Sequence, residues 1–379
     1  MAAHLMAAEV DAVVERAVVE QRLVGVSVMV SVGGKLLYRR SAGLADRNTG
    51  RPLPDDAIFL LASITKPFVS VLAMQLAEAG QLDLAAPVSE YLPDFRPALL
   101  DGNRPDITVL QLLTHTAGLS YGMSPEDYAA FHVAGASNGM DVPGLNSTDA
   151  ANRLAKVPMR FAPGTSWEYS TGMDVVGWVI EAVTHRRLGE SVAEYITGPL
   201  GIVDTGFVVS DAARLVTYYT NASPKPQVVH EGSVIVAGTD RTSVAPGRIL
   251  DPMSYHSGGA GMVGTVAGVW TFLEAVRTGR LLDAESWSRM LTVQAGMDKI
   301  PTGPGVGFGI GWAVLDDPVR NGSPQSRGTL NWAGTYGHNW FIDSTHEITV
   351  VSLSNTTPAG MFSDYTLQLR DAVYRGLAQ

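Results

Sequence analysis

The chain has 379 residues, of which 46% are hydrophobic, and a formal net charge of −10. This charge disfavours a nucleic-acid partner, because phosphate binding needs basic surface. The absence of cysteine excludes disulfides, a thiol nucleophile and thiolate metal sites. No apolar run reaches the ~18 residues of a membrane span, and the N-terminus lacks the basic and apolar regions of a signal peptide. We therefore expect a cytoplasmic protein with neither a membrane nor a nucleic-acid partner, and the oligomeric state stays open.

The first elements of the chain are a helix and a hairpin. Residues 6–22 have an amphipathic pattern that predicts a helix. Residues 24–32 and 35–43 alternate like strands on either side of Gly33-Gly34, a pair typical of a hairpin turn.

A buried helix is expected to begin near Ser63. Apolar residues follow with helical spacing, Pro67 fits a first turn, and Gly80 suits the C-terminal end. Ser63 and Lys66 are three residues apart, so their side chains share one face of the first turn. Backbone N–H groups and the helix dipole would face whatever the serine holds, and the dipole would disfavour the protonated amine. This arrangement predicts an activated nucleophile.

The middle of the chain predicts short helices and loops, whereas the end predicts a meander of strands. The expected helices cover residues 107–115, a segment starting at Ser124, and 150–157, 173–185 and 265–278. Residues 205–257 carry only weak strand signals, at 228–236. The expected strands are 308–315, 328–333, 339–343 and 348–353, followed by a helix over 361–377.

Strands at both ends with helices between them predict an α+β fold. We expect one antiparallel sheet, made from both termini and flanked by helices, with a mostly helical domain inserted between them. The expected boundaries are 1–82 with 256–379 for the sheet domain, and 83–255 for the helical domain with its irregular insertion.

Ser63-x-x-Lys66 is a hydrolase motif that chance also supplies easily. The chain has 22 arginines but only five lysines, and a buried lysine can lose its proton whereas arginine cannot. Apolar neighbours on both sides favour a desolvated Lys66. On these local features, an N-cap serine followed by a solvated lysine stays open as the alternative.

Two other motifs favour plain turns. Gly118 to Gly122 matches G-x-S-x-G around Ser120, but a helical run precedes it where a nucleophile elbow needs a strand. Residues 259–264 match G-x-G-x-x-G without a preceding strand, so we expect a tight loop there. The eight histidines show no metal-binding spacing, and we expect neither a metal nor another cofactor.

Two aromatic segments are further candidates. Tyr169 precedes a helix and could relay a proton once a cation lowers its pKa, the alternative being a core tyrosine. Residues 331–340 are dense in aromatic and small residues at a strand edge. Free N–H groups there could complete an oxyanion hole, the alternative being a hairpin turn with packed aromatics.

Together these stretches resemble the serine β-lactamase-like hydrolases over most of the chain. The resemblance is to the family VIII carboxylesterases, relatives of class C β-lactamases and D-alanyl-D-alanine peptidases. It is carried by Ser63-Ile-Thr-Lys66, Leu112-Leu-Thr-His-Thr-Ala-Gly-Leu119, Phe161-Ala-Pro-Gly-Thr-Ser-Trp-Glu-Tyr169-Ser170 and Trp332-Ala-Gly334. The last motif stands where these esterases have W-G-G and the β-lactamases have K-T-G.

The departures from the β-lactamase motifs indicate a different substrate. Thr171 replaces the asparagine that contacts a lactam amide, and Trp332 replaces the lysine that pairs with the antibiotic's carboxylate. Ala333 replaces the middle glycine of W-G-G and narrows the slot. A carboxylate would lose its partner, so neutral esters should be preferred.

The resemblance implies hydrolysis of short-chain or small neutral esters through an acyl-enzyme. Ser63 would be the nucleophile, Lys66 the general base and Tyr169 the proton donor to the leaving alcohol. The resemblance also implies that the N–H groups of Thr335 and Ser63 would bind the oxyanion together, with Gly334 beside Thr335. Trp332, Tyr121 and Tyr336 would form the apolar wall of the pocket. His338 would be a supporting or merely structural group.

Other functions stay open. The same site could serve a β-lactamase, a D-amino peptidase or an acyltransferase that prefers an alcohol to water. A non-catalytic recognition protein with a penicillin-binding-type fold is the alternative outside enzymes.

Overall fold

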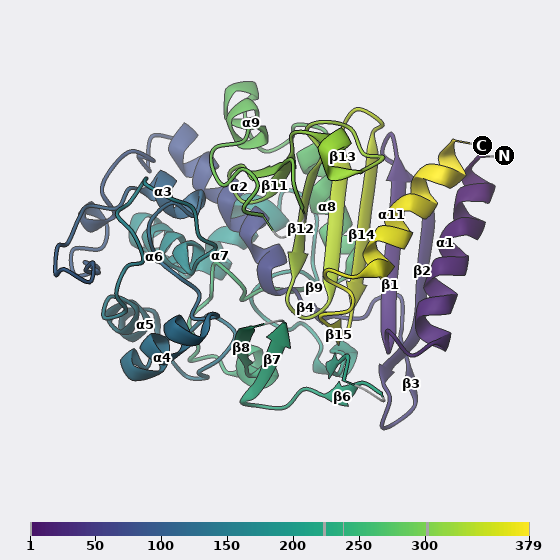
Figure 1. The fold of residues 1–379 in the computed structure, drawn as a ribbon, viewed down its shortest axis with the longest axis horizontal. Helices are drawn as coiled ribbons and strands as arrows, with labels where there is room; N and C mark the ends of the chain where they lie inside the picture. The colour runs from purple at the N-terminus through teal and green to yellow at the C-terminus, as the bar shows by residue number, and fades with distance from the viewer. Residues whose placement is uncertain (1, 223–224, 238, 301–302, 379) are drawn as a thin grey trace.

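An eight-stranded antiparallel sheet, in the order β10-β11-β12-β13-β14-β1-β2-β3, runs through the molecule (Figure 1). The computed structural model describes residues 2–222, 225–237, 239–300 and 303–378. The sheet strands are β1 (Gly25–Val32), β2 (Lys35–Asp46), β3 (Arg51–Pro52), β10 (Val306–Phe308), β11 (Ala313–Leu315), β12 (Leu330–Gly334), β13 (His338–Asp343) and β14 (Ile348–Ser354). Because β1 pairs with β14, the two ends of the chain build one sheet, as predicted.

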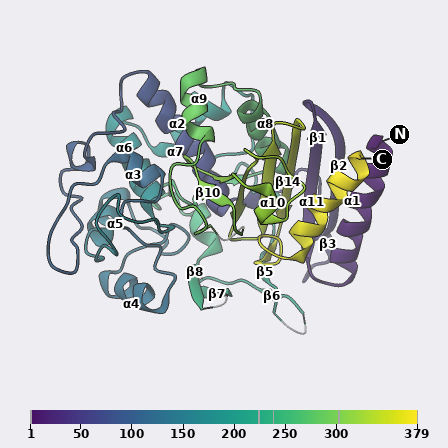
Figure 2. The same cartoon turned by 45° about the horizontal axis from the view of Figure 1, so that its top comes forward.

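Helices cover both faces of this sheet. Helices α1 (Ala2–Val19) and α11 (Asp364–Leu377) lie side by side over one face, where they bring the two termini together (Figures 1 and 2). They cross closely at Gly376, where a Cβ would lie 2.2 Å from the Cα of Met6. Helices α2 (Thr65–Glu78) and α8 (Val266–Arg277) pack in the larger core, and α8 contacts β1 and β14.

A group of helices lies beyond the β10–β12 side of the sheet (Figure 1). Its helices are α3 (Val109–Leu113), α4 (Pro125–Ala134), α5 (Ser147–Leu154), α6 (Gly172–Thr184) and α7 (Leu188–Val192), the last continued by a π-helical turn at Ala193–Thr197. Thr108, Ser124 and Asn146 cap α3, α4 and α5 by accepting backbone hydrogen bonds.

Several short elements complete the fold. They are β4 (Phe59–Leu60) paired with β9 (Val263–Gly264), the sheet of β15 (Thr356–Thr357), β5 (Tyr219–Thr220) and β6 (Gln227–Val228), the hairpin of β7 (Ser233–Ala237) and β8 (Asp240–Val244), and helices α9 (Ala284–Leu291) and α10 (Pro318–Asn321). No described helix is long and apolar enough to cross a membrane.

Most predicted elements are confirmed, with some corrections. The first helix covers Ala2–Val19 rather than 6–22, and α7 and α9 were not expected. The strand predicted over 308–315 is wrong as one element. A tight turn divides it, in which the Gly309 N–H donates to Trp312 O, and a Cβ on Gly311 would lie 2.5 Å from Ser70 Oγ of α2. The division into 1–82 with 256–379 and 83–255 stays a prediction.

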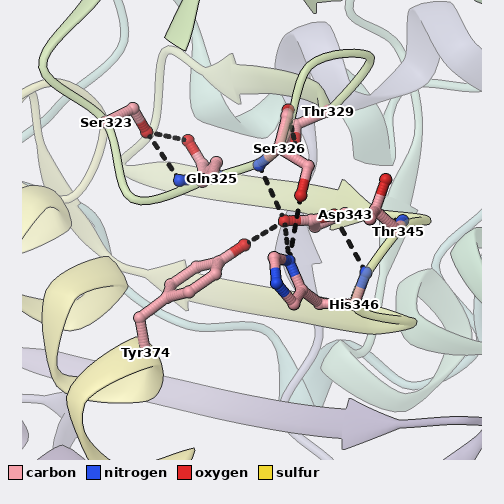
Figure 3. A network of polar contacts seen from close by, with 8 residues as sticks. All are labelled: Ser323, Gln325, Ser326, Thr329, Asp343, Thr345, His346 and Tyr374. Atoms are coloured by element: carbon pink, nitrogen blue, oxygen red, sulfur yellow. Dashed lines mark hydrogen bonds and ion pairs between the residues drawn. The ribbon is translucent and has the colours of Figure 1, made fainter. Parts of the chain in front are cut away.

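One buried carboxylate ties α11 to the sheet (Figure 3). Asp343, at the end of β13, accepts hydrogen bonds from the Tyr374 hydroxyl at 2.5 Å, the Ser326 N–H at 2.9 Å and His346 Nδ1 at 3.0 Å. Its side chain is fully buried. Burial alone would raise the pKa of Asp343, but these hydrogen bonds outweigh it, and the pKa lies below its ordinary value.

Asp343→Ala is expected to lower the free energy of unfolding at neutral pH by about 2–4 kcal/mol, because Tyr374 and Ser326 lose a shared acceptor inside the protein. Since the folded protein lowers this pKa, the contribution is present above the unfolded-state pKa of about 4 and is lost as the pH falls further. Urea unfolding at several pH values measures both effects. Asp316→Ala, which breaks the exposed pair with Arg327, should cost less than about 1 kcal/mol; equal costs for the two variants would contradict the assignment.

Candidate active site

Ser63 lies on a turn that is held by hydrogen bonds before and after it. The turn, a 3₁₀ segment over Ala62–Ile64, connects β4 to α2. Ala62 has φ 46°, in the left-handed region that non-glycine residues seldom adopt. The N–H of Leu61 donates to Met262 O at 2.8 Å, and that of Met262 donates to Thr65 Oγ1 at 3.0 Å. The chain around 262 therefore holds the nucleophile segment in a conformation that it would not adopt alone.

Lys66 is fully buried and has three polar neighbours. Its Nζ lies 3.1 Å from Ser63 Oγ, 3.0 Å from the Tyr121 hydroxyl and 2.8 Å from the carbonyl oxygen of Gly259. Burial lowers its pKa to about 7, although the charge of Asp174 opposes that shift. The expected desolvation of Lys66 is thus the main cause of its lowered pKa, and part of the amine is neutral at neutral pH. The contribution of the helix dipole stays a prediction.

Tyr169 reaches the same serine from the loop before α6. Its hydroxyl donates to Ser63 Oγ at 2.7 Å, and its ring lies 5.0 Å from that of Tyr121 and 5.2 Å from that of Trp332. Burial raises the pKa of Tyr169. The expectation that a cation lowers this pKa is therefore wrong, and the phenol keeps its proton. A protonated phenol at this position suits a proton donor better than a base.

His115 packs against Tyr169 and contacts the residue that follows it. Its Nδ1 accepts a hydrogen bond from the Ser170 N–H at 3.2 Å, and its ring lies 4.8 Å from that of Tyr169. Burial, together with the charge of Lys66, holds the pKa of His115 well below its usual value. The neutral ring therefore fixes the backbone next to Tyr169 without adding charge to the site.

The C-terminal end of β12 lies against the nucleophile segment. A Cβ on Gly334 would come within 2.6 Å of Leu61 O, so only glycine permits this approach. His338, opposite Gly334 in β13, places its Nε2 2.7 Å from Leu60 O, and burial lowers its pKa to about 4. Neutral His338 thus donates to the chain just before Ser63. The carbonyl of Thr335 accepts a hydrogen bond from Thr357 Oγ1, while the role of the Thr335 N–H in an oxyanion hole stays a prediction.

Aromatic side chains surround Ser63, Lys66 and Tyr169. Trp332 packs 5.2 Å from Phe308 as well as against Tyr169. Tyr336 packs 4.5 Å from Tyr218, whose hydroxyl accepts a hydrogen bond from the Leu60 N–H. The position that carries a lysine in β-lactamases is therefore an apolar wall here.

The sequence interpretation missed three features of the site. The Gly259 carbonyl and the Tyr121 hydroxyl both contact Lys66, whereas Gly259 was expected only in a tight loop and Tyr121 only in the pocket wall. Asp174 was not considered, although an acid in the first turn of the largely apolar helix α6 could have been noticed in the sequence. Ser120 is buried in a loop and makes no side-chain hydrogen bond among the described residues, in keeping with a plain turn.

The described residues supply the parts of a covalent hydrolase. Ser63 Oγ has a partly neutral amine on one side and a protonated phenol on the other, which is the pairing that nucleophilic catalysis needs. Among these residues, no cluster of three or more histidines or acidic groups is placed to hold a metal ion.

A family model described as Beta-lactamase matches residues 10–374. The chain belongs to the Beta-lactamase family. Within this family, the chain is 41% identical over 378 residues to Esterase EstB of Burkholderia gladioli, covering 97% of this chain and 95% of that protein.

Solved structures of relatives have the same fold. The structure of "EstCE1, a hydrolase with promiscuous acyltransferase activity" superposes with a TM-score of 0.95 at 37% identity and covers 98% of this chain and 99% of that one. A simvastatin synthase from Aspergillus terreus has a TM-score of 0.77 at 24% identity, covers 98% of this chain and 97% of that one, and supports the fold alone. The fold is therefore that of the Beta-lactamase family, as predicted.

Proposed function

We propose that this protein is a serine carboxylesterase that hydrolyses short-chain or small neutral esters through an acyl-enzyme. The observation that carries the proposal is the pair of contacts at Ser63 Oγ, 3.1 Å to Lys66 Nζ and 2.7 Å to the Tyr169 hydroxyl. The relative named as an esterase, at 41% identity, and the relative described as a hydrolase, at 37% identity, support the same reaction class. A cytoplasmic location stays a prediction from the sequence.

The reaction begins when Ser63 Oγ attacks the ester carbonyl carbon and neutral Lys66 accepts the hydroxyl proton. The oxyanion would lie between the N–H groups of Ser63 and Thr335. As the ester C–O bond breaks, Tyr169 gives its proton to the leaving alkoxide and regains one from Lys66. Water then attacks the acyl-enzyme with the same pair acting in reverse, which releases the acid and restores Ser63.

Trp332 favours uncharged substrates. A carboxylate on the acyl group would be desolvated against Trp332, Tyr169 and Phe308, and a buried charge without a partner is costly. We expect kcat/KM for p-nitrophenyl butyrate to exceed that for the mono-p-nitrophenyl ester of succinate by about 10- to 100-fold. Initial rates on the two esters measure this, and equal values would contradict the neutral-ester assignment.

The alternatives use the same residues and are separated by their products. Turnover of a penicillin or cephalosporin faster than that of the neutral ester would indicate a β-lactamase. A mixture in which added alcohol captures most of the acyl group would indicate an acyltransferase. A fluorophosphonate that leaves Ser63 unlabelled would indicate a recognition protein.

A further inference from the structure

A buried acid lies in the first turn of α6, close to the proposed catalytic residues but away from the substrate. Asp174 is 1% exposed. Its carboxylate faces the Ser257 hydroxyl and the Gly259 N–H, but neither oxygen makes a hydrogen bond of good geometry within the described part of the chain. Such a carboxylate is costly unless a charge compensates it, so its position needs an explanation beyond packing.

Two glycines make room for this carboxylate. A Cβ on Gly259 would lie 2.7 Å from the Tyr121 hydroxyl and 2.9 Å from Asp174 Oδ2. A Cβ on Gly139 would lie 2.3 Å from Ser257 Oγ and 3.2 Å from Asp174 Oδ1. The Tyr121 hydroxyl and the Gly259 carbonyl are also the partners of Lys66. The acid and the lysine therefore share one set of neighbours.

Two cations act on Asp174. They are Lys66 and Arg248, and both favour its charged form. Arg248 is itself buried, donates to Tyr255 O at 2.7 Å and lies over the Tyr255 ring at 4.5 Å. The other titratable groups that face this cluster are Tyr121, Tyr169 and Tyr255 around Asp174, His115 beside Lys66, and Asp141, Tyr336 and His256 beside Arg248.

We propose that Asp174 is a positioning residue whose carboxylate is the buried counter-charge of Lys66. It touches neither the ester nor Ser63 and acts through the lysine, whose ammonium form it stabilises against desolvation. This inference rests on the proposed function, because it assigns a role to Lys66 as the base.

The sign of the effect follows from the charges. Burial lowers the pKa of Lys66 to about 7, and Asp174 raises it against that trend. Without the carboxylate, the lysine loses its proton at lower pH. Both groups border the Tyr121 hydroxyl and the Gly259 backbone. Loss of the carboxylate should therefore move the acid limb of kcat/KM for a neutral ester to lower pH by about 1 unit in Asp174→Asn. KM should stay unchanged, since the acid does not contact the substrate.

The test compares pH profiles of the wild-type protein, Asp174→Asn and a matched control, Asp141→Asn. Asp141 is a half-buried acid that accepts hydrogen bonds from Ser137 Oγ at 2.7 Å and the Asn138 N–H at 3.0 Å, and it faces Arg248 rather than Lys66. The acid limb should move only in Asp174→Asn. A limb that coincides with that of the wild-type protein, or an equal shift in Asp141→Asn, would overturn the proposal.

If Asp174→Asn fails to fold, a second variant tests the same proposal. Ser257→Ala removes the hydroxyl that lowers the pKa of Asp174, so the counter-charge is lost at higher pH and the acid limb should move in the same direction by a smaller amount. An unmoved limb in this folded variant would also contradict the proposal. Failure of the proposed function looks different, because the wild-type protein itself would then show no Ser63-dependent ester turnover.

Discussion

Ser63→Ala is expected to lower kcat/KM for a short-chain p-nitrophenyl ester by on the order of 10⁴-fold or more. Alanine offers no oxygen to the ester carbonyl, and Lys66 and Tyr169 then have no hydroxyl between them. Ser63 is buried in the turn before α2, where alanine fits without strain, so the fold should be retained. Stopped assays at matched protein concentration, with circular dichroism as the folding check, measure the loss.

Ser120→Ala is the matched control for this variant. Ser120 carries the competing nucleophile motif, but its hydroxyl makes no hydrogen bond in the described structure and so contacts no general base there. We expect wild-type rates within a factor of about two, since loss of a single unpaired hydroxyl costs little. Activity that survives in Ser63→Ala and disappears in Ser120→Ala would reverse the assignment of the nucleophile.

Lys66→Met should be nearly as damaging, with a loss of about 10³- to 10⁴-fold in kcat. Methionine fills a similar buried volume but cannot take the proton of Ser63. Lys299→Met is the control, because the Lys299 side chain is exposed and its Nζ donates to Ser166 Oγ at 2.8 Å, far from Ser63 in the sequence. Equal activity of the two variants would remove Lys66 from the mechanism.

The wild-type pH profile tests the same role without a mutation. In the proposed mechanism the neutral amine of Lys66 is the active form, and burial lowers its pKa to about 7. The rate should therefore fall tenfold for each unit below that pH and level off above it. An acid limb near the ordinary pKa of a carboxyl group would point to a different base.

The features that depend on residues close together in the chain were predictable from the sequence. Ser63 and Lys66 share a helical turn because their spacing requires it, and the sheet built from both termini follows from strand patterns at each end. Tyr169 was placed by resemblance to a family motif, and its hydroxyl does lie at Ser63. The direction of its pKa shift was predicted wrongly, because the degree of burial decides the pKa and cannot be read from one segment.

The parts that sequence did not predict depend on distant contacts. The contact of Lys66 with the Gly259 carbonyl joins residues 193 positions apart, and no local pattern indicates such a partner. The strand predicted over 308–315 is divided because Gly311 must approach α2, which is again a tertiary constraint. Asp174 differs from these cases, because an acid in a largely apolar helix was visible in the sequence. Its role follows only from the residues that surround it in the fold.

The central claim, a covalent acyl group on Ser63, is tested most directly by mass spectrometry of the protein quenched in acid during turnover of a slow ester. We expect an intact mass increased by one acyl group, located after proteolysis on the peptide that contains Ser63, and no increase in Ser63→Ala. An acyl group on another residue, or rapid hydrolysis with no adduct in rapid-quench samples that precede the first turnover, would contradict it.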